Sequence, residues 1–275
     1  MTFAESHAAA AARWPAGTTS VDVPTSWGRT HLLTDGPADA PVVVLLHGGG
    51  ATATSWADLA GELTGRYRLL APEQPGAPGL SDAARPPRST ADLVAWLDEL
   101  RTALGLRRWH LVGHSAGAHL ALSAALAAWD DVATLTLLDP TAVVAGFGPR
   151  YLARALPSLL RPSPAGVRRF LAWETRRRAL PPVWVDTYVR GATELDGGPL
   201  VRTRRPRRSR LAALAVPTLV VVAGAGRAHD PARVARRAQG LPGTTVLTLP
   251  AATHHTLPLL DAPEIAAALA AHLAR

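Results

Sequence analysis

The stretch Trp109-His110-Leu111-Val112-Gly113-His114-Ser115-Ala116-Gly117 decides the fold, because it joins a short apolar run to a tight, glycine-rich turn. Residues 109–112 predict a strand, and residues 115–128 predict a helix so apolar that it must be buried. A G-x-S-x-G turn between such elements strains the serine and presents its hydroxyl at the carboxyl end of the strand. A glycine turn without chemical importance is the alternative. The two flanking elements favour Ser115 as a nucleophile.

Strands and helices alternate along most of the chain, which predicts an α/β fold with a parallel sheet. Strands are expected at residues 19–23, 30–34, 41–46, 67–71, 109–112, 132–138, 218–223 and 245–249. Helices are expected at residues 54–63, 89–104, 115–128, 231–239 and 262–273. Between residues 140 and 211 the alternation gives way to helical pieces at 150–156, 165–178 and 183–191, interrupted by prolines. This segment is interpreted as a helical insertion over one end of the sheet.

The composition excludes several classes of protein. A chain of 275 residues with 48% hydrophobic and 18% charged residues can bury a sizeable core, so it is not generally disordered. The absence of cysteine excludes disulfides, thiolate metal sites and a thiol nucleophile. Residues 1–16 lack the basic start and apolar core of a signal peptide, and no run of about 18 apolar residues predicts a membrane span. We therefore expect a cytoplasmic protein without stable membrane insertion.

The net charge of +8 is unevenly distributed. All 29 basic residues are arginine, and 15 of them lie between Arg150 and Arg210, against four acidic residues. Nucleic-acid binding through residues 202–210 is one alternative, because basic runs neutralise phosphates. Residues 202–210 contain no lysine and none of the stacking aromatic residues that such surfaces usually combine with arginine, so we expect no nucleic-acid partner. Steering of anionic substrates and a simple solvated face are the other interpretations.

A second glycine-rich turn, His47-Gly48-Gly49-Gly50, follows the strand at 41–46. Glycine lets the backbone approach a substrate closely, and paired N–H groups can stabilise a tetrahedral oxyanion. We predict that the N–H groups of Gly49 and Ala116 form this oxyanion hole. A phosphate-binding loop is less consistent, since the turn lacks the required lysine. His47 is interpreted as a structural residue that holds the loop.

The candidate general base lies in Thr253-His254-His255, between the last strand and the last helix. This position places it at the same sheet edge as Ser115, where a serine nucleophile needs a histidine to accept its proton. Adjacent side chains point in different directions, so at most one of the two histidines can serve. We favour His254, because the small Thr253 suits a tight turn, and we keep His255 as the alternate.

With these motifs the chain resembles the α/β-hydrolase superfamily, in its serine hydrolase or esterase-like branch. The likeness covers nearly the whole chain and includes the loop Gly76-Ala77-Pro78-Gly79-Leu80-Ser81-Asp82. The resemblance implies an eight-stranded, mostly parallel sheet flanked by helices, with a helical lid inserted after strand six. It divides the chain into a core of residues 17–140 and 211–275 and a lid of residues 141–210.

The sequence departs from this family in the position of the catalytic acid. The resemblance places the acid about three residues after Gly224, where this chain has Arg227. Asp139, at the end of the sixth strand, and Asp230, a few residues beyond the expected position, are the candidates. Asp before proline is also typical of a turn or a helix cap. We favour Asp139, because a strand end is rigid and faces the site, and keep Asp230 as the alternate.

These residues predict hydrolysis of a carboxylic ester through an acyl-enzyme on Ser115. Thioesters, lactones, amides and carbon–carbon bonds use the same constellation and stay open. The aromatic residues of the insertion predict a small-molecule substrate with an apolar acyl part: Phe147, Tyr151, Phe170, Trp173 and Trp184. No cofactor and no metal are expected, since the remaining histidines lack metal-ligand spacing. A non-catalytic binding protein of this fold is the alternative that the missing acid favours.

Overall fold

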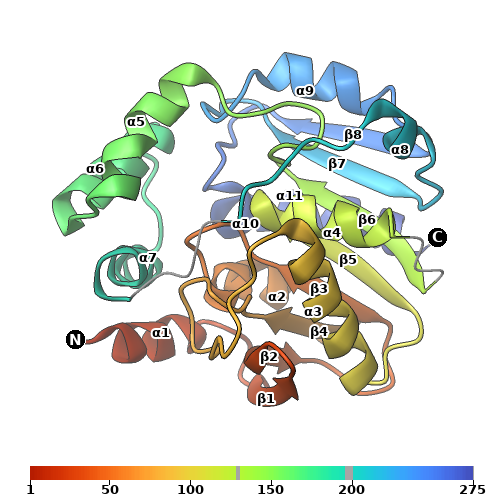
Figure 1. The fold of residues 1–275 in the computed structure, drawn as a ribbon, viewed down its shortest axis with the longest axis horizontal. Helices are drawn as coiled ribbons and strands as arrows, with labels where there is room; N and C mark the ends of the chain where they lie inside the picture. Colours follow the sequence, from red (N-terminus) through yellow and green to blue (C-terminus); the bar gives the residue numbers. More distant parts are fainter. Residues whose placement is uncertain (128–130, 196–200, 275) are drawn as a thin grey trace.

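The computed structural model of the protein describes residues 1–127, 131–195 and 201–274, and eight strands in this part of the chain form one sheet (Figure 1). The strands are β1 (Thr19–Thr25), β2 (Gly28–Asp35), β3 (Val42–Leu46), β4 (Arg68–Pro72), β5 (Trp109–His114), β6 (Val132–Leu138), β7 (Thr218–Ala223) and β8 (Thr244–Leu249). Their order is β1-β2-β4-β3-β5-β6-β7-β8. The β1–β2 and β2–β4 pairs are antiparallel and all others are parallel, so the predicted fold class is confirmed.

Helices cover both faces of the sheet (Figure 1). They are α1 (Phe3–Ala11), α2 (Ala57–Leu63), α3 (Thr90–Ala103), α4 (Ala116–Ala125), α5 (Pro149–Leu160), α6 (Pro164–Glu174), α7 (Pro182–Glu194), α8 (Arg208–Ala212), α9 (Pro231–Ala238), α10 (Leu257–Leu260) and α11 (Ala262–Leu273). A 3₁₀ helix, η1 (Ala53–Trp56), precedes α2. Side chains of α3, α4 and α9 pack on one face, and those of α2 and α11 on the other.

The central strands are apolar throughout because both of their faces are covered. Along β3, Val44 and Leu46 lie on the face of the sheet that α4 covers, while Val43 and Leu45 lie on the face that α2 covers. All of these side chains are essentially inaccessible to solvent. Full burial of a side chain of this size contributes about 1.5–3 kcal/mol, so the two clusters hold the strand ends in fixed positions.

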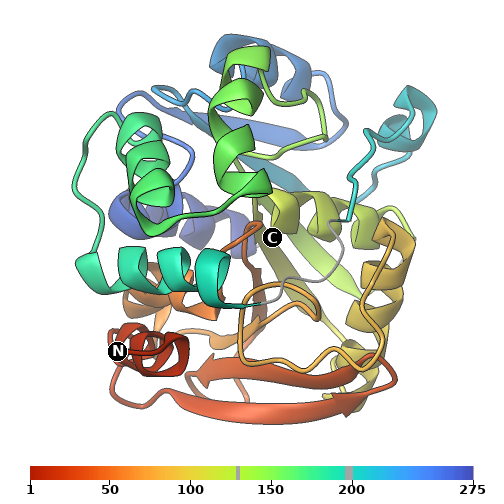
Figure 2. The ribbon, with the colours of Figure 1, turned by 60° about the vertical axis from the view of Figure 1, so that its left-hand side comes forward.

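The helices α5, α6 and α7 lie over the carboxyl edge of the sheet (Figure 2). Their apolar side chains form a third cluster that includes Ala51, Ala228 and Leu259, which follow β3, β7 and β8. They occupy the stretch that the sequence identifies as an insertion. Residues 196–200 of that stretch lie outside the described residues. No helix in the described part of the chain is long and apolar enough to cross a membrane.

The first helix, α1, was not predicted from the sequence. It packs against α7, below the inserted helices (Figure 2). Thr2 and Glu5 form a capping box at its start, in which each side chain accepts a hydrogen bond from the other residue's N–H. This spacing is visible in the sequence and could have predicted the helix. The other expected helices of the core are present, although α4 ends at Ala125 and residues 128–130 lie outside the described residues.

Candidate active site

Ser115 lies in the turn between β5 and α4, with a backbone conformation that side chains rarely adopt (φ 54°, ψ −113°). Two glycines make the turn possible. A Cβ on Gly113 would lie 2.3 Å from the carbonyl oxygen of Gly117, and a Cβ on Gly117 would lie 2.1 Å from that of Leu46. The Ser115 N–H donates to the Leu138 carbonyl at 3.0 Å, which attaches the turn to β6. The serine is therefore held at the carboxyl edge of the sheet, where the sequence places it.

His254 connects Ser115 to a carboxylate. Its Nε2 lies 2.9 Å from Ser115 Oγ, and its Nδ1 lies 2.6 Å from Asp139 Oδ2. A carboxylate next to Nδ1 favours the tautomer with the proton on Nδ1, so Nε2 can accept the serine proton. His114 donates from Nε2 to the His254 carbonyl at 2.8 Å, which holds the backbone of His254. All four side chains are buried.

Asp139 follows β6 directly and has a positive φ of 42°. Its N–H donates to the Val221 carbonyl at 2.7 Å, and its Oδ1 accepts a hydrogen bond from the Ala223 N–H at 3.1 Å. Burial would raise the pKa of this carboxyl, but the attraction and hydrogen bonds of His229 and His254 outweigh it. The pKa of Asp139 therefore lies well below its usual range, and the group is a carboxylate.

The structure places the two alternates elsewhere. Asp230 is exposed, and its Oδ1 accepts a hydrogen bond from the Arg233 N–H at 3.1 Å, so it caps the first turn of α9. His255 directs its Nδ1 to Glu174 Oε2 at 2.9 Å rather than toward Ser115. Arg227, at the position where the family resemblance places the acid, lies with its guanidinium 4.9 Å from the ring centre of Trp173.

Glu174, on α6, is a site residue that the sequence reasoning missed. It is fully buried and accepts hydrogen bonds from the N–H groups of His254 (2.9 Å) and His255 (3.2 Å) and from Thr253 Oγ1 (3.3 Å). Burial would raise the pKa of its carboxyl, but the neighbouring His255 outweighs this effect and lowers it. A signal was available: Val167, Phe170, Leu171 and Glu174 follow the i, i+3, i+4, i+7 spacing of one buried helix face.

The glycine-rich turn after β3 packs directly on the serine turn. A Cβ on Gly48 would lie 2.9 Å from His114 Nδ1, and one on Gly49 would lie 4.0 Å from the Cβ of Ala116. His47 holds this turn: its Nδ1 donates to the Gly48 carbonyl at 2.9 Å, and its Nε2 accepts from the Gln74 N–H at 3.2 Å. Burial lowers the pKa of His47, consistent with this neutral tautomer and with its structural interpretation.

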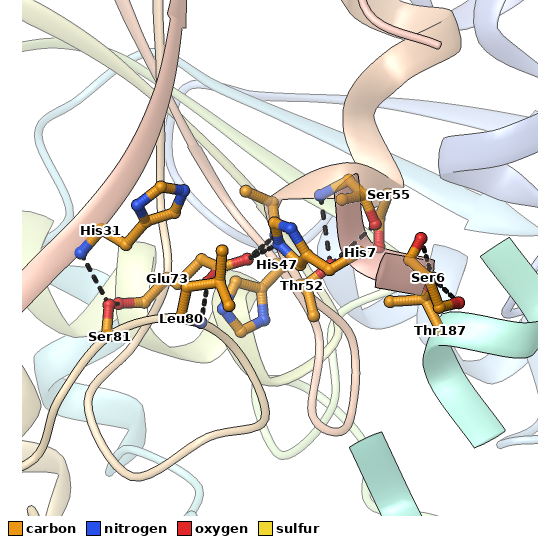
Figure 3. A network of polar contacts seen from close by, with 12 residues as sticks. Ser6, His7, His31, His47, Thr52, Ser55, Glu73, Leu80, Ser81 and Thr187 are labelled. Carbon is orange, nitrogen blue, oxygen red and sulfur yellow. Dashed lines mark hydrogen bonds and ion pairs between the residues drawn. The ribbon is translucent and has the colours of Figure 1, made fainter. Parts of the chain in front are cut away.

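A buried network continues behind this turn toward the N-terminal helix (Figure 3). Glu73 Oε1 lies 2.7 Å from His7 Nε2 and accepts from the Ala53 N–H at 3.3 Å, while its Oε2 accepts from the Leu80 N–H. The side chain of Ser6, next to His7, lies 2.9 Å from Thr187 Oγ1 on α7. The helix α1 thus links the glycine-rich turn to the helices above the site.

The cavity at Ser115 is narrow, about 20 Å³. Its lining combines both glycine-rich turns, the two histidines and side chains of α7: Gly48, Gly49, Ala51, Ser55, His114, Ser115, Trp184, Tyr188, His254, His255 and Pro258. The rings of Phe147 and Tyr151 lie 6.2 and 6.3 Å from that of His254. Aromatic side chains from the segment above the sheet therefore form one wall of the site.

A larger cavity of about 530 Å³ lies beside this aromatic wall and does not include Ser115. Arginines surround Trp173 there: Arg154, Arg169, Arg176, Arg177 and Arg227. In the described part of the chain, no group of three or more histidine and carboxylate side chains is arranged to hold a metal ion.

Comparison with known proteins gives the family. Residues 43–269 match the sequence model described as the alpha/beta hydrolase family. The chain is 28% identical over 185 residues to the protein called "Uncharacterized carboxylesterase nap" of Bacillus subtilis, which covers 67% of this chain and 61% of that protein. It is 29% identical over 136 residues to carboxylesterase YbfK of the same organism, covering 50% and 46%. The chain thus spans less than two thirds of the length of these relatives.

Solved structures share the fold over nearly the whole chain. The crystal structure of carboxylesterase CesB (YbfK) from Bacillus subtilis has a TM-score of 0.91 at 22% identity, covering 98% of this chain and 96% of that one. The naproxen esterase (carboxylesterase NP) of the same organism has a TM-score of 0.90 at 24% identity, covering 97% and 95%.

Proposed function

Because this chain belongs to the alpha/beta hydrolase family, we propose that it is a serine hydrolase that cleaves carboxylic esters through an acyl-enzyme on Ser115. The observation that carries the proposal is the hydrogen-bonded series Ser115–His254–Asp139, with distances of 2.9 and 2.6 Å. The carboxylesterase names of two relatives support an ester as the substrate.

The proposed reaction has two steps. Ser115 Oγ attacks the ester carbonyl carbon while His254 Nε2 takes the hydroxyl proton and then gives it to the leaving alcohol. Water, deprotonated by the same histidine, then hydrolyses the acyl-enzyme and releases the acid and the free serine. Asp139 holds the imidazole in the required tautomer and stabilises the imidazolium that forms in each step.

The N–H groups of Gly49 and Ala116 are proposed as the oxyanion hole. Their support is the packing of the two turns against each other and the position of Ala116 at the N-terminus of α4, where the helix dipole favours negative charge. Each such donor typically contributes about 3–4 kcal/mol to lowering the barrier.

Residues 141–210 are proposed as a lid on a core of residues 17–140 and 211–275. The support is the position of α5, α6 and α7 over the carboxyl edge, with Tyr151 and Phe170 turned toward the two histidines. An aromatic wall and a narrow cavity suit a small-molecule ester whose acyl part is apolar.

Hydrolysis of aryl esters with acyl chains of increasing length tests the proposal. We expect turnover by the wild-type protein and a loss on the order of 10⁵-fold or more in Ser115→Ala, because only binding and the oxyanion hole remain. Ester hydrolysis that survives the substitution, in a protein with unchanged thermal unfolding, would show that the serine is not the nucleophile.

A further inference from the structure

The carboxylate of Asp139 contacts two histidines, and the reaction described above uses only one of them. Oδ2 faces His254, whereas Oδ1 lies 2.9 Å from Nε2 of His229, in the loop between β7 and α9. The ring centres of His229 and His254 are 6.3 Å apart, and the rings are nearly perpendicular at 88°. The side chain of His229 is 2% exposed, so this contact is as buried as the site itself.

Three charged or titratable groups face His229. They are Asp139 at the end of β6, His254 in the loop after β8, and Asp230 in its own loop. Burial lowers the pKa of His229, but the attraction of Asp139, its hydrogen bond and the charge of Asp230 outweigh burial and raise that pKa. The ring nitrogen away from the carboxylate, Nδ1, is buried and has no hydrogen-bond partner within the described residues.

We propose that His229 is a positioning residue that holds Oδ1 of Asp139, so that Oδ2 faces His254, and that its charge is coupled to that of His254 through the carboxylate they share. This inference rests on the proposed function of Ser115, His254 and Asp139. One carboxylate cannot fully stabilise two imidazolium ions, and two cations at this separation repel each other. Once His229 is protonated, a second proton on His254 is disfavoured. A positive charge on His229 therefore favours the neutral form of His254, in which Nε2 can accept the proton of Ser115.

Two substitutions separate the hydrogen bond from the charge. His229→Gln keeps an N–H donor for Oδ1 but does not titrate, whereas His229→Phe keeps a planar ring and loses the donor as well. Asp230→Asn is the second comparison in the same loop: it removes one of the charges that face His229 but keeps the oxygen that caps α9 and the contact between His229 and Asp139. It should change the pH dependence less than His229→Gln does.

The readout is the rate at which a fluorophosphonate modifies Ser115, measured from about pH 5 to pH 9. This rate reports the fraction of active base without requiring a known substrate. In His229→Gln we expect the labelling rate at high pH to stay within about threefold of wild type. The acid limb of the profile, where the rate falls as the pH is lowered, should move to a higher pH by about one unit. In His229→Phe we expect a high-pH rate at least about tenfold lower as well, because Asp139 loses a hydrogen bond.

An acid limb in His229→Gln that coincides with the wild-type limb would overturn the proposal, even if thermal unfolding shows that the residue stabilises the loop. Titration of the Cε1–H signals of His229 and His254 by NMR adds a test independent of catalysis. We expect the midpoint of the His229 titration to move in His254→Gln, and a midpoint that stays in place would contradict the coupling. Absence of labelling in the wild-type protein would instead contradict the proposed function and leave the NMR result to decide the role of His229.

Discussion

His254 and His255 are neighbours in the chain and have nearly the same local chemistry, but they occupy opposite positions in the site. Each directs Nδ1 to a buried carboxylate, His254 to Asp139 at 2.6 Å and His255 to Glu174 at 2.9 Å. Nε2 of His254 then reaches Ser115 Oγ at 2.9 Å, whereas His255 only lines the cavity. A histidine–carboxylate pair is therefore not enough to identify a catalytic base. The third contact, from Nε2 to Ser115 Oγ, distinguishes the two pairs.

The two carboxylates also come from different parts of the fold. Asp139 ends a central strand and is held by backbone contacts to β7. Glu174 ends α6, above the sheet, and accepts hydrogen bonds from the backbone N–H groups of both histidines. The geometry of the first pair suits proton transfer, while the second pair connects the helices above the site to the loop that carries both histidines.

Exchange of each histidine for glutamine gives the largest expected contrast. In His254→Gln, kcat/KM for an aryl ester should fall by about 10⁵-fold or more, since the serine loses its proton acceptor. In His255→Gln the loss should stay below about tenfold, because a neutral side chain can still contact Glu174. Steady-state kinetics on both purified variants measures the difference. Equal losses of kcat/KM in the two variants would show that the contact to Ser115 does not distinguish His254 from His255.

Substitution of the two carboxylates should give a smaller contrast in the same direction. Asp139→Asn should reduce kcat by about 10⁴-fold, because an amide stabilises the wrong tautomer of the imidazole. Asp230→Asn is the control and should leave kcat unchanged, since its side chain caps α9. If Glu174→Gln, with its fold intact, loses as much activity as Asp139→Asn, the assignment of Asp139 as the catalytic acid would be contradicted.

The second pair, His255–Glu174, should matter more for the free energy of unfolding than for activity. Glu174→Gln should lower the free energy of unfolding by about 3–5 kcal/mol, because it breaks a buried pair and turns an amide N–H toward backbone donors. His255→Gln should cost less, about 1–2 kcal/mol, since the backbone contacts of Glu174 persist. Urea unfolding followed by tryptophan fluorescence measures both values. A Glu174→Gln protein as stable as wild type would mean that this carboxylate does not hold the loop.

The smallest expected effect is on acid stability. The pKa values of Asp139 and Glu174 are both lowered in the folded chain, so each carboxylate stabilises the fold above the pKa of the unfolded chain, about 4. That contribution is lost as the pH falls below this value and the groups become protonated. The double variant Asp139→Asn, Glu174→Gln should therefore show a shallower loss of stability between about pH 5 and pH 3 than wild type. If the free energies of unfolding of the two proteins fall in parallel over this pH range, the pKa values of Asp139 and Glu174 are not lowered in the folded chain.

Local patterns in the sequence predicted most of the sheet and the serine turn. The bounds of β6 and β7 agree with expectation, since β-branched residues buried on both faces form continuous apolar runs. The strained turn at Ser115 was predictable because glycine is required on either side of it. These features depend on residues that are close together in the chain.

The partners of His254 are harder to predict because they depend on contacts between distant residues. Asp139 is 115 positions away from His254, and the sequence placed both at one sheet edge without excluding Asp230. Glu174 and His229 were missed for the same reason. The spacing of the apolar residues in α6 places Glu174 on its buried face, but the roles of both residues depend on how α6 and the loop after β7 pack onto the edge.

Mass spectrometry of the protein after reaction with a fluorophosphonate tests the assignment of the nucleophile most directly. We predict a single phosphonyl group on the peptide that contains Ser115, no modification in Ser115→Ala, and strongly slowed modification in His254→Gln but not in His255→Gln. Modification at a different serine, or an unmodified protein that still hydrolyses esters, would contradict the assignment of Ser115 and of the pair His254–Asp139 that serves it.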